Sequence, residues 1–460
     1  MLGLVLASVV VVICGYLIFK NYKAQAVLLC GGFAMMACAI IFHFGPIIPA
    51  KTSTGFVWFD LFKFVDSLTS KRTADLGLMI MTCAGFAKYM DKIGASKAMV
   101  QVAVKPLRHI RSPYLVLCGG FIIAQFLHPF IPSASGFGLL LMVTMYPIYI
   151  SLGISRTTAT AVIGTNGCLD LGPASGNSIL AAKYGGMTPV DYFVNFQLVP
   201  AIAISLAMVI VHYFVARWFD KKHEGGLAQG IPREESVDSA QKGKDEDIPP
   251  KIYALLPAVP LILILLFGYF KVGGISMDLN VALYIGLAVA MLMELIRFHN
   301  FKKIFSSIQT FFDGMGVQFA TVITLIIAGE VFAKGLTSLG AIDTMIKGGQ
   351  GAGFGKDAMV LLMSGIITGA SIVMGSGNAP FFAFAAFAPD VATQVGAQAV
   401  NLLMPMQLSA SVARSMSPIT AVIVAISGVA GVSPFEVIKR TSIPLIVGLV
   451  VIQVVTLFMF

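Results

Sequence analysis

The sequence predicts an all-α polytopic membrane protein, with about ten transmembrane helices plus two re-entrant hairpins in two inverted repeats. Three observations predict this fold: the composition, the continuous apolar runs, and short motifs that occur twice. Of the 460 residues, 57% are hydrophobic and only 12% are charged, whereas about 25% of a soluble domain is charged. Lipid rather than water must therefore face most of the surface.

Long apolar runs occupy most of the chain, and they are continuous rather than alternating in polarity. Because only helices and closed barrels span lipid, continuous runs indicate helices. The first run lacks the positive n-region and the small-residue cleavage site of a secretory signal, so we interpret it as a first span. The runs cover residues 2–19, 25–43, 75–90, 114–131, 134–151, 158–181, 195–216, 252–270, 279–297, 316–334, 357–375, 378–392, 400–430 and 441–460.

A long polar stretch at 217–251 separates these runs into two groups. It mixes Lys, Arg, Glu and Asp, and it contains Pro249 and Pro250 near its end. This composition is typical of a loosely ordered linker, because it cannot bury enough apolar surface to fold. We therefore expect a first repeat at 1–216, a cytoplasmic linker at 217–251 and a second repeat at 252–460.

Three short motifs occur in both halves, in the same order and at nearly the same spacing. A duplicated fold is the economical explanation, and such repeats are common in secondary transporters. The paired stretches are FAKYMDKIGA at 86–95 with FAKGLTSLGA at 332–341, Gly172-Pro173 with Ser417-Pro418, and TPVD at 188–191 with SPFE at 433–436.

The order of the apolar runs predicts the topology of each half. Three spans precede a hairpin, at 114–151 and at 357–392, and two crossings follow, of which the first is a broken helix at 158–181 or 400–430. Five crossings are an odd number, so the second half must be inverted relative to the first. With both termini outside, more than twice as many Lys and Arg residues fall inside as outside, as the positive-inside rule requires.

Composition and motifs also exclude several functions. The formal net charge of +9 fits the loop bias, and no dense basic run is interleaved with aromatic residues, so we expect no nucleic-acid partner. No P-loop, HExxH or G-x-S-x-G motif occurs in a suitable context, so we expect no enzyme and no cofactor. The six cysteines form no CxxC pair, so we expect no metal site.

Arg414 is the residue that points most directly to a cargo, because it lies inside the apolar run 400–430. A central arginine costs a few kcal/mol even on lenient insertion scales, and it is tolerated mainly where it faces a cavity. Its planar guanidinium matches a carboxylate with two parallel hydrogen bonds. The alternative is an arginine paired with a buried acid or with backbone carbonyls.

Four polar segments are expected to meet Arg414 near the middle of the membrane. The stretches GTNGCLDLGPASGN at 164–177 and SASVARSMSP at 409–418 must interrupt their helices, and the hairpin tips at 133–136 and 375–380 are rich in Gly and Ser. Broken helices and such tips expose backbone groups that bind ions where they line a cavity. The candidate substrate-binding residues are Ser133, Ser135, Asn166, Ser376, Asn378, Arg414, Ser415 and Ser417.

Four further residues are candidates for a coupling ion, either H⁺ or Na⁺. Asp170, Ser175 and Asn177 lie in the first broken helix, and Asp170 is the preferred site. Glu330 lies in the run 316–334, where it could carry a proton or pair with Lys334 one turn on. His128, another intramembrane ionisable residue, is more typical of a packing residue than of a proton relay.

Several of these stretches resemble a known family, the anaerobic four-carbon dicarboxylate carriers of the DcuC type within the ion transporter superfamily. The resemblance is carried by DLGLMIMTCAGFAKYMDKIGA, by the tip MGSGNAPFFAF and by the tail SMSPITAVIVAISGVAGVSPFEVIKRTSIPLIVGL. It runs nearly end to end and is strongest after residue 357. It implies a carrier of succinate, fumarate or malate in a bacterial inner membrane, with periplasmic termini, working by efflux or fumarate/succinate exchange.

The same resemblance implies further properties of the site and the assembly. Superfamily relatives hold substrate with Ser-Asn-Thr tips, whereas the tips here contain Ser133-Ala134-Ser135 and Ser376-Gly377-Asn378. The missing threonines favour proton coupling or plain exchange over sodium. Relatives often form homodimers and move as elevators, which we expect here as well.

Two other functions stay open from the sequence. An exchanger of amino acids or short-chain carboxylates could use the same fold. An anion channel would need a continuous polar stripe along several spans, whereas the polar residues here cluster near the midplane.

Overall fold

A computed structural model describes residues 2–20, 22–110, 112–223, 249–341 and 355–460. All regular structure within these ranges is helical, with no strand. Nine described helices are long and apolar enough to cross a membrane, and two shorter apolar helices lie at Leu2–Ile18 and Ala421–Ala430. The prediction of an all-α polytopic membrane protein is therefore confirmed.

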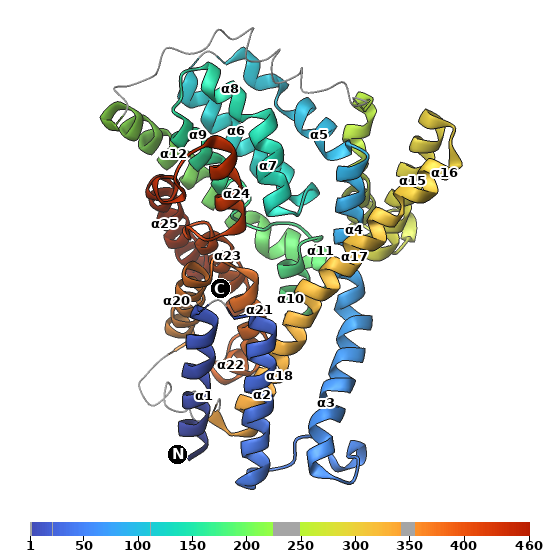
Figure 1. The fold of residues 1–460 in the computed structure, drawn as a ribbon, viewed down its shortest axis with the longest axis vertical. Coiled ribbons are helices and arrows are strands. Elements are labelled where there is room, and N and C mark those ends of the chain that lie inside the picture. The colour runs from blue at the N-terminus through green and yellow to red at the C-terminus, as the bar shows by residue number, and fades with distance from the viewer. Residues whose placement is uncertain (1, 21, 111, 224–248, 342–354) are drawn as a thin grey trace.

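The first half contains twelve α-helices (Figure 1). Their bounds are α1 Leu2–Phe19, α2 Ala24–Ile41, α3 Val57–Arg72, α4 Leu78–Lys92, α5 Ala95–Ala103, α6 Pro113–Leu127, α7 Ala134–Thr144, α8 Tyr146–Ser151, α9 Arg156–Thr165, α10 Gly176–Tyr184, α11 Pro189–Tyr192 and α12 Leu198–His223. Because α12 continues to His223, residues 217–223 of the predicted linker are helical. Residues 224–248 of that linker lie outside the described residues, and residues 249–251 lead into the 3₁₀ segment Lys251–Ala258.

The described part of the second half repeats this order. Its helices are α14 Val259–Leu263, α15 Leu279–Phe298, α16 Phe301–Ser307, α17 Gln309–Gln318, α18 Thr324–Ser338, α20 Lys356–Met374, α21 Asn378–Phe384, α22 Ala388–Gln394, α23 Ala399–Arg414, α24 Ala421–Ala430 and α25 Pro434–Met459. Shorter 3₁₀ and π segments join them at Ala50–Thr52, Thr73–Gly77, Lys105–His109, His128–Phe130, Phe193–Gln197, Lys251–Ala258, Ile264–Tyr269, Val272–Gly274, Phe319–Ile323 and Ala385–Phe387.

Irregular features of the backbone recur at matching places in the two halves. A π-helical turn at Thr73–Gly77 precedes α4, and another at Phe319–Ile323 precedes α18 at the same spacing as the FAK motifs. The second-to-last residue of each motif is a glycine with positive φ, Gly94 (76°) and Gly340 (66°). These matches agree with the predicted repeat, and the inverted orientation of the halves stays a prediction.

Both predicted hairpins form helix–turn–helix units. In the first, α6 is followed by the 3₁₀ turn His128–Phe130 and then by α7 and α8; in the second, α20 is followed by α21 and α22. The two units lie toward opposite ends of the long axis of the molecule (Figure 1). Whether they re-enter the membrane from the side where they begin stays a prediction.

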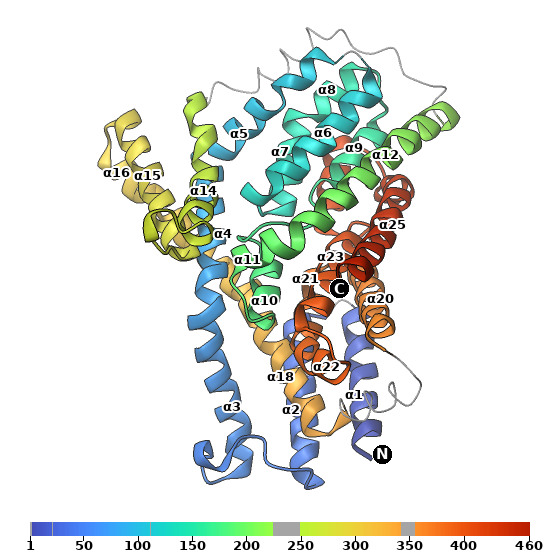
Figure 2. The ribbon, with the colours of Figure 1, turned by 180° about the vertical axis from the view of Figure 1, so that it is seen from behind.

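The two halves pack into each other rather than side by side. Helix α4 packs on α17, α2 packs on α18 and α12 packs on α25 (Figure 2). At the first crossing, a Cβ on Gly85 would lie 2.6 Å from the carbonyl oxygen of Phe311; at the second, a Cβ on Gly32 would lie 2.6 Å from that of Val331. Small residues thus bring the backbones into contact, as in other membrane helix pairs.

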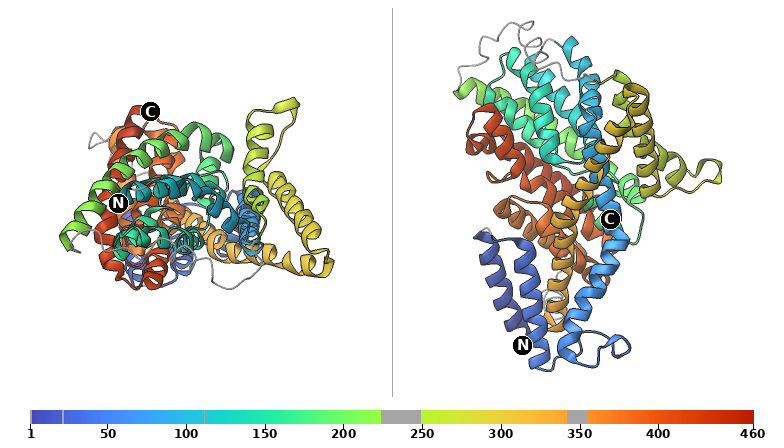
Figure 3. Two further views of the ribbon diagram at one scale, coloured as in Figure 1. Left: turned by 90° about the horizontal axis from the view of Figure 1, so that it is seen from above. Right: turned by 45° about the vertical axis from the view of Figure 1, so that its right-hand side comes forward.

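Two helices of this bundle are buried along nearly their whole length. Every residue of α23 from Val400 to Ala413 is buried, and so is every residue of α9 from Thr158 to Thr165. In contrast, α15 and α16 project from the rest of the molecule (Figure 3). A helix that is covered on all sides belongs to the core, and both of these core helices end where the predicted breaks lie.

Candidate functional site

The first broken helix is interrupted between α9 and α10 by residues 166–175. Two residues there have positive φ, Asp170 (49°) and Gly172 (104°). Gly172 lies against the first hairpin, because a Cβ at this position would be only 2.9 Å from Cβ of Pro129. The turn therefore needs glycine at 172, and it directs Asp170 into the interior.

Asp170 is held by both halves of the protein. Asn177, at the start of α10, donates from Nδ2 to Asp170 Oδ2 (2.5 Å) and to Asn378 Oδ1 of the second hairpin tip (3.1 Å). Gln407, from the middle of α23, donates to the Asp170 carbonyl oxygen (3.2 Å). Nε2 of His128 lies 3.9 Å from Asp170 Oδ1.

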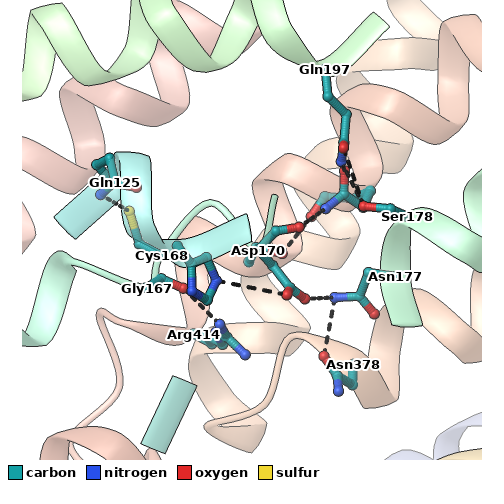
Figure 4. A network of polar contacts seen from close by, with 12 residues as sticks. Gln125, Gly167, Cys168, Asp170, Asn177, Ser178, Gln197, Asn378 and Arg414 are labelled. Atoms are coloured by element: carbon teal, nitrogen blue, oxygen red, sulfur yellow. Dashed lines mark hydrogen bonds and ion pairs between the residues drawn. The ribbon is translucent and has the colours of Figure 1, made fainter. Parts of the chain in front are cut away.

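This network continues away from Asp170 through buried amides (Figure 4). Gln197 donates to Gln407 Oε1 (2.7 Å) and to the Ser178 hydroxyl (2.9 Å). Because low surrounding polarity strengthens such bonds, the network fixes the break of the first helix against α23.

Arg414 is the last residue of α23, and it spans the gap between the two broken helices. Its Nη2 donates to the carbonyl oxygen of Gly167 (2.8 Å). Its Nε is buried and has no hydrogen-bond partner among the described residues. The side chain is only partly buried, so the guanidinium combines one fixed backbone contact with remaining donors that a ligand can use.

The two hairpin tips are built differently. Ser133 caps α7, and its hydroxyl accepts from the Gly136 amide (3.3 Å). In the second tip, Gly375 has φ of 62°, and the Ser376 hydroxyl accepts from the Ala379 amide (3.4 Å). Gly377 touches α23, since a Cβ there would lie 2.7 Å from the carbonyl oxygen of Ala410.

The first broken helix, the two hairpin tips and Arg414 all border one cavity of about 1020 Å³. Helices α7, α10 and α24 begin at it, through Ala134, Gly176 and Ala421. Helix N-termini carry partial positive charge and therefore favour anions. The charged residues in the lining are Lys23, Lys88, Arg414, Asp91 and Asp170.

The structure brings six of the predicted site residues to this cavity: Ser133, Ser135, Asp170, Ser376, Asn378 and Arg414. Asn177 is one hydrogen bond away, through Asn378. The others lie behind the lining: Asn166, Ser175 and Ser417 are buried with side-chain polar atoms that have no partner in the described chain, and Ser415 is 1% exposed. Their roles stay predictions.

Glu330 lies away from the cavity, on α18, and its side chain faces the end of α3. Arg72 contacts it from Nε (2.7 Å to Oε1), and the Tyr184 hydroxyl donates to the same oxygen (2.7 Å). The pair suggested from sequence, with Lys334, is replaced by this one, since Lys334 lies over the Phe64 ring. Its role as a coupling residue stays a prediction.

The sequence reasoning missed Lys88, Asp91, Gln197 and Gln407. Gln197 and Gln407 were detectable as uncharged polar residues inside apolar runs. Lys88 and Asp91 belong to the FAK motif, which we used only as evidence of a repeat. Within the described chain, no group of three or more His, Cys, Asp or Glu residues could hold a metal ion.

Comparisons with known proteins agree with this architecture. The family model DcuC, C4-dicarboxylate anaerobic carrier, matches residues 2–460. The anaerobic C4-dicarboxylate transporter DcuC of Escherichia coli O6:H1 is 36% identical over 455 residues, 98% of this chain and 96% of that protein. The protein of the same name in Shigella flexneri is 35% identical over 455 residues, with the same coverage of 98% and 96%.

Two solved structures share the fold. The crystal structure of the Alcanivorax borkumensis YdaH transporter has a TM-score of 0.63 and 12% identity, and the match covers 94% of this chain and 97% of that one. Neisseria gonorrhoeae MtrF, described with a class of antimetabolite efflux pumps, has a TM-score of 0.64 and 13% identity, covering 94% of each chain. At such identities the likeness concerns the fold alone.

Proposed function

The chain belongs to the DcuC family of C4-dicarboxylate anaerobic carriers, and from this premise we propose that it carries succinate, fumarate and malate across the bacterial inner membrane. It is a multi-pass membrane transporter and not an enzyme. We propose that it works as a secondary transporter, by succinate efflux or by exchange of fumarate for succinate.

The observation that carries the proposal is the position of Arg414 at a cavity where α2, α7, α10, α21 and α24 begin. Arg414 binds one carboxylate of the cargo through the donors that Gly167 does not use. The N-termini of α7, α10 and α24 stabilise the remaining negative charge. A dianion fits this field better than a neutral or zwitterionic solute does.

The second carboxylate lies at the second hairpin tip in this proposal. Ser376 and Asn378 line the cavity and offer a hydroxyl and an amide, which can donate to a carboxylate oxygen. Asn378 also accepts from Asn177 (3.1 Å). That bond joins the cargo site to Asp170, the preferred coupling residue.

We propose proton coupling rather than sodium coupling, with Asp170 as the first candidate for the proton and Glu330 as the second. Ser175 and Asn177, whose side chains do not titrate, are candidates only for binding a sodium ion. Asp170 faces the cavity and is already bonded to Asn177. We also propose a homodimer with both termini in the periplasm. The mass of the detergent-purified protein tests the dimer, and a reporter fused to the C-terminus tests the orientation.

Labelled succinate offered to proteoliposomes tests the cargo. The vesicles are prepared with and without internal fumarate, and the sodium and pH gradients are varied separately. Uptake that needs internal fumarate supports exchange, and uptake driven by a pH gradient supports proton coupling. Absence of succinate movement under every condition contradicts the proposal.

The same vesicles distinguish the two other candidate functions. Competition of unlabelled amino acids or short-chain monocarboxylates for the labelled succinate tests the wider exchanger. Anion currents that greatly exceed the succinate flux would indicate a channel. Vesicles that contain Arg414→Ala are the matched control, since this variant removes the guanidinium from the cavity and leaves Lys23 and Lys88 in place.

A further inference from the structure

The geometry points to His128 and Asp170 as one shared proton-binding site, an inference that rests on the proposed function. His128 belongs to the 3₁₀ turn of the first hairpin and is 0% exposed. Its Nε2 lies 3.9 Å from Asp170 Oδ1. Neither ring nitrogen has a hydrogen-bond partner among the described residues.

A histidine that serves only in packing normally satisfies a ring nitrogen, because buried polar groups without partners are costly. His212 on α12 is such a case in this chain: it is 2% exposed, and its Nε2 lies 3.0 Å from the Thr165 hydroxyl. His128 has no such side-chain bond: besides Asp170, only the backbone of Ile131 in the same turn approaches its ring nitrogens in the described chain. A proton held between Nε2 and Asp170 Oδ1 supplies the missing hydrogen bond.

The ring of His128 is fixed so that it faces the acid. It stacks on Phe137 of α7, with ring centroids 5.7 Å apart. On its other side, a Cβ built on Gly167 would lie 3.6 Å from Cε1. The ring therefore lies between α7 and segment 166–175, and the motion needed to shorten the distance to Asp170 is small.

Protons reach this pair through Asp170. Asp170 lines the cavity, and its side chain is 10% exposed whereas that of His128 is 0% exposed. Oδ2 already accepts from Asn177, so Oδ1 is the oxygen that remains for His128. Because the two groups interact, the proton belongs to the pair rather than to either residue alone.

The charge of this pair controls the affinity for a dianion. Arg414 donates to the carbonyl oxygen of Gly167, where an added Cβ would lie 3.6 Å from His128 Cε1. Without the proton, the pair carries one negative charge beside Arg414 and repels the cargo. With the proton the pair is neutral, so proton and dicarboxylate each strengthen the binding of the other by the same factor.

The other titratable or charged groups that face the pair lie on several elements. Arg414 comes from α23 and Cys168 from segment 166–175. Those on the cavity wall further away are Lys23, Cys83, Lys88 and Asp91. In the range where a carboxylate or imidazole titrates, Arg and Lys keep their charge, so the pair and Asp91 are the groups that can change charge at the cavity. Of these, the pair is the one that interacts with Arg414.

Calorimetry of fumarate binding to the purified full-length protein tests this inference. Titrations in buffers of different ionisation enthalpy give the number of protons taken up as the ligand binds. Fumarate is the probe because both of its carboxyl groups are fully ionised near neutral pH, so it cannot carry the proton itself. The wild type should take up protons, and its affinity should fall up to about tenfold per pH unit above the titration of the pair.

His128→Asn and Asp170→Asn should lose this proton uptake, and their fumarate affinity should no longer fall with rising pH. His212→Asn is the matched control, as a buried histidine outside the pair, and it should keep the proton uptake. His128→Gln replaces His128→Asn if the latter does not elute as a folded protein.

Three results would overturn the inference. In the first, His128 and Asp170 variants keep the wild-type proton uptake. In the second, the wild type binds fumarate without proton uptake; the dicarboxylate cargo then stands, while the pair loses its role. In the third, the wild type neither binds nor transports any dicarboxylate, and the proposed function fails together with this inference.

Discussion

The broken helices α9–α10 and α23–α24 hold opposite charges at nearly matching places. Asp170 lies in the first break, between Gly167 and Gly172, and Arg414 lies at the start of the second break, ahead of Ser417-Pro418. Arg414 reaches across to the Gly167 carbonyl, so the two breaks form one site rather than two equivalent ones. A duplicated backbone can therefore bind an anion with one copy and a proton with the other.

The backbones of the two breaks also differ. The first has positive φ at Asp170 and Gly172, and Asp170 accepts from amides of α10 and α23, through its carboxylate and its carbonyl oxygen respectively. The second runs from Ser415 to Thr420 with no positive φ. Its carbonyl groups accept from hydroxyls instead: Thr420 donates to Arg414, and Thr441 donates to Ser415 (3.4 Å).

The largest effect is expected from Arg414→Ala, which removes the positively charged side chain at the second break. Dicarboxylate affinity should fall at least about thirtyfold, because truncating one partner of a buried charge pair costs about 2–5 kcal/mol. Arg414→Lys keeps the charge but not the planar fork, and the loss should be nearer to about tenfold. Calorimetry with fumarate measures both, and unchanged affinity in Arg414→Ala would assign this residue to the backbone contact alone.

Glu330→Gln tests whether the acidic residue that binds the coupling proton lies in the first break or on α18. The substitution leaves Arg72 without its anionic partner, and both side chains are largely buried, 15% and 9% exposed. The free energy of unfolding should fall by about 3 kcal/mol, seen as a lower melting temperature. Asp66→Asn in the exposed pair with Lys63 is the control and should change little.

The same Glu330 variant should keep the proton uptake that accompanies fumarate binding. Loss of this uptake would contradict the assignment of the proton to the first break, because the coupling residue would then lie on α18, outside both breaks.

Alanine substitution of one glycine in each hairpin tip should have a smaller effect on stability, and the two variants can be compared directly. A Cβ on Gly377 would lie 2.7 Å from the Ala410 carbonyl oxygen, so Gly377→Ala must push the tip off the α23 backbone. We expect a loss of about 1–3 kcal/mol in stability and slower transport. A Cβ on Gly136 would lie 3.0 Å from the Ser133 hydroxyl and 3.9 Å from Asp91 Oδ2, both on side chains that can move. Gly136→Ala should therefore cost at most about 1 kcal/mol, through a weakened Ser133 cap. Equal melting temperatures for the two variants would contradict the difference between the tips.

The smallest effects are expected from one serine in each break. The hydroxyls of Ser175 and Ser417 are buried without a partner among the described residues, and neither residue lines the cavity. Ser175→Ala and Ser417→Ala should each change dicarboxylate affinity by less than about threefold. A larger loss for only one of them, in the fumarate titration, would show which break moves closer to the cargo during transport.

Local sequence was sufficient for much of the site. Glycine and proline at 172–173, and proline at 418, favour the interruption of a membrane helix, and the structure ends α9 and α23 close to them. An arginine in an apolar run predicts a cavity for the same reason, namely the cost of its charge in lipid, and Arg414 does line one. Such inferences need only neighbouring residues.

The partners across the fold could not be read in this way. From the sequence, Lys334, one turn away, is the possible ion-pair partner of Glu330, whereas the folded chain pairs Glu330 with Arg72 on another helix. His128 was interpreted as a packing residue, because its distance to Asp170 depends on how the first hairpin closes over segment 166–175. Gln407 was overlooked since its partner is a backbone carbonyl in the other half.

The sequence by itself determined the membrane class, the helical spans, the repeated motifs and the places where two helices must break. These follow from the transfer of side chains into lipid and from backbone geometry, both of which act residue by residue. Only the tertiary structure decided that the two breaks face each other, with Arg414 on Gly167 and Asp170 beside His128. That arrangement depends on close packing between helices far apart in the chain, as at Gly85 and Gly32, which no local pattern specifies.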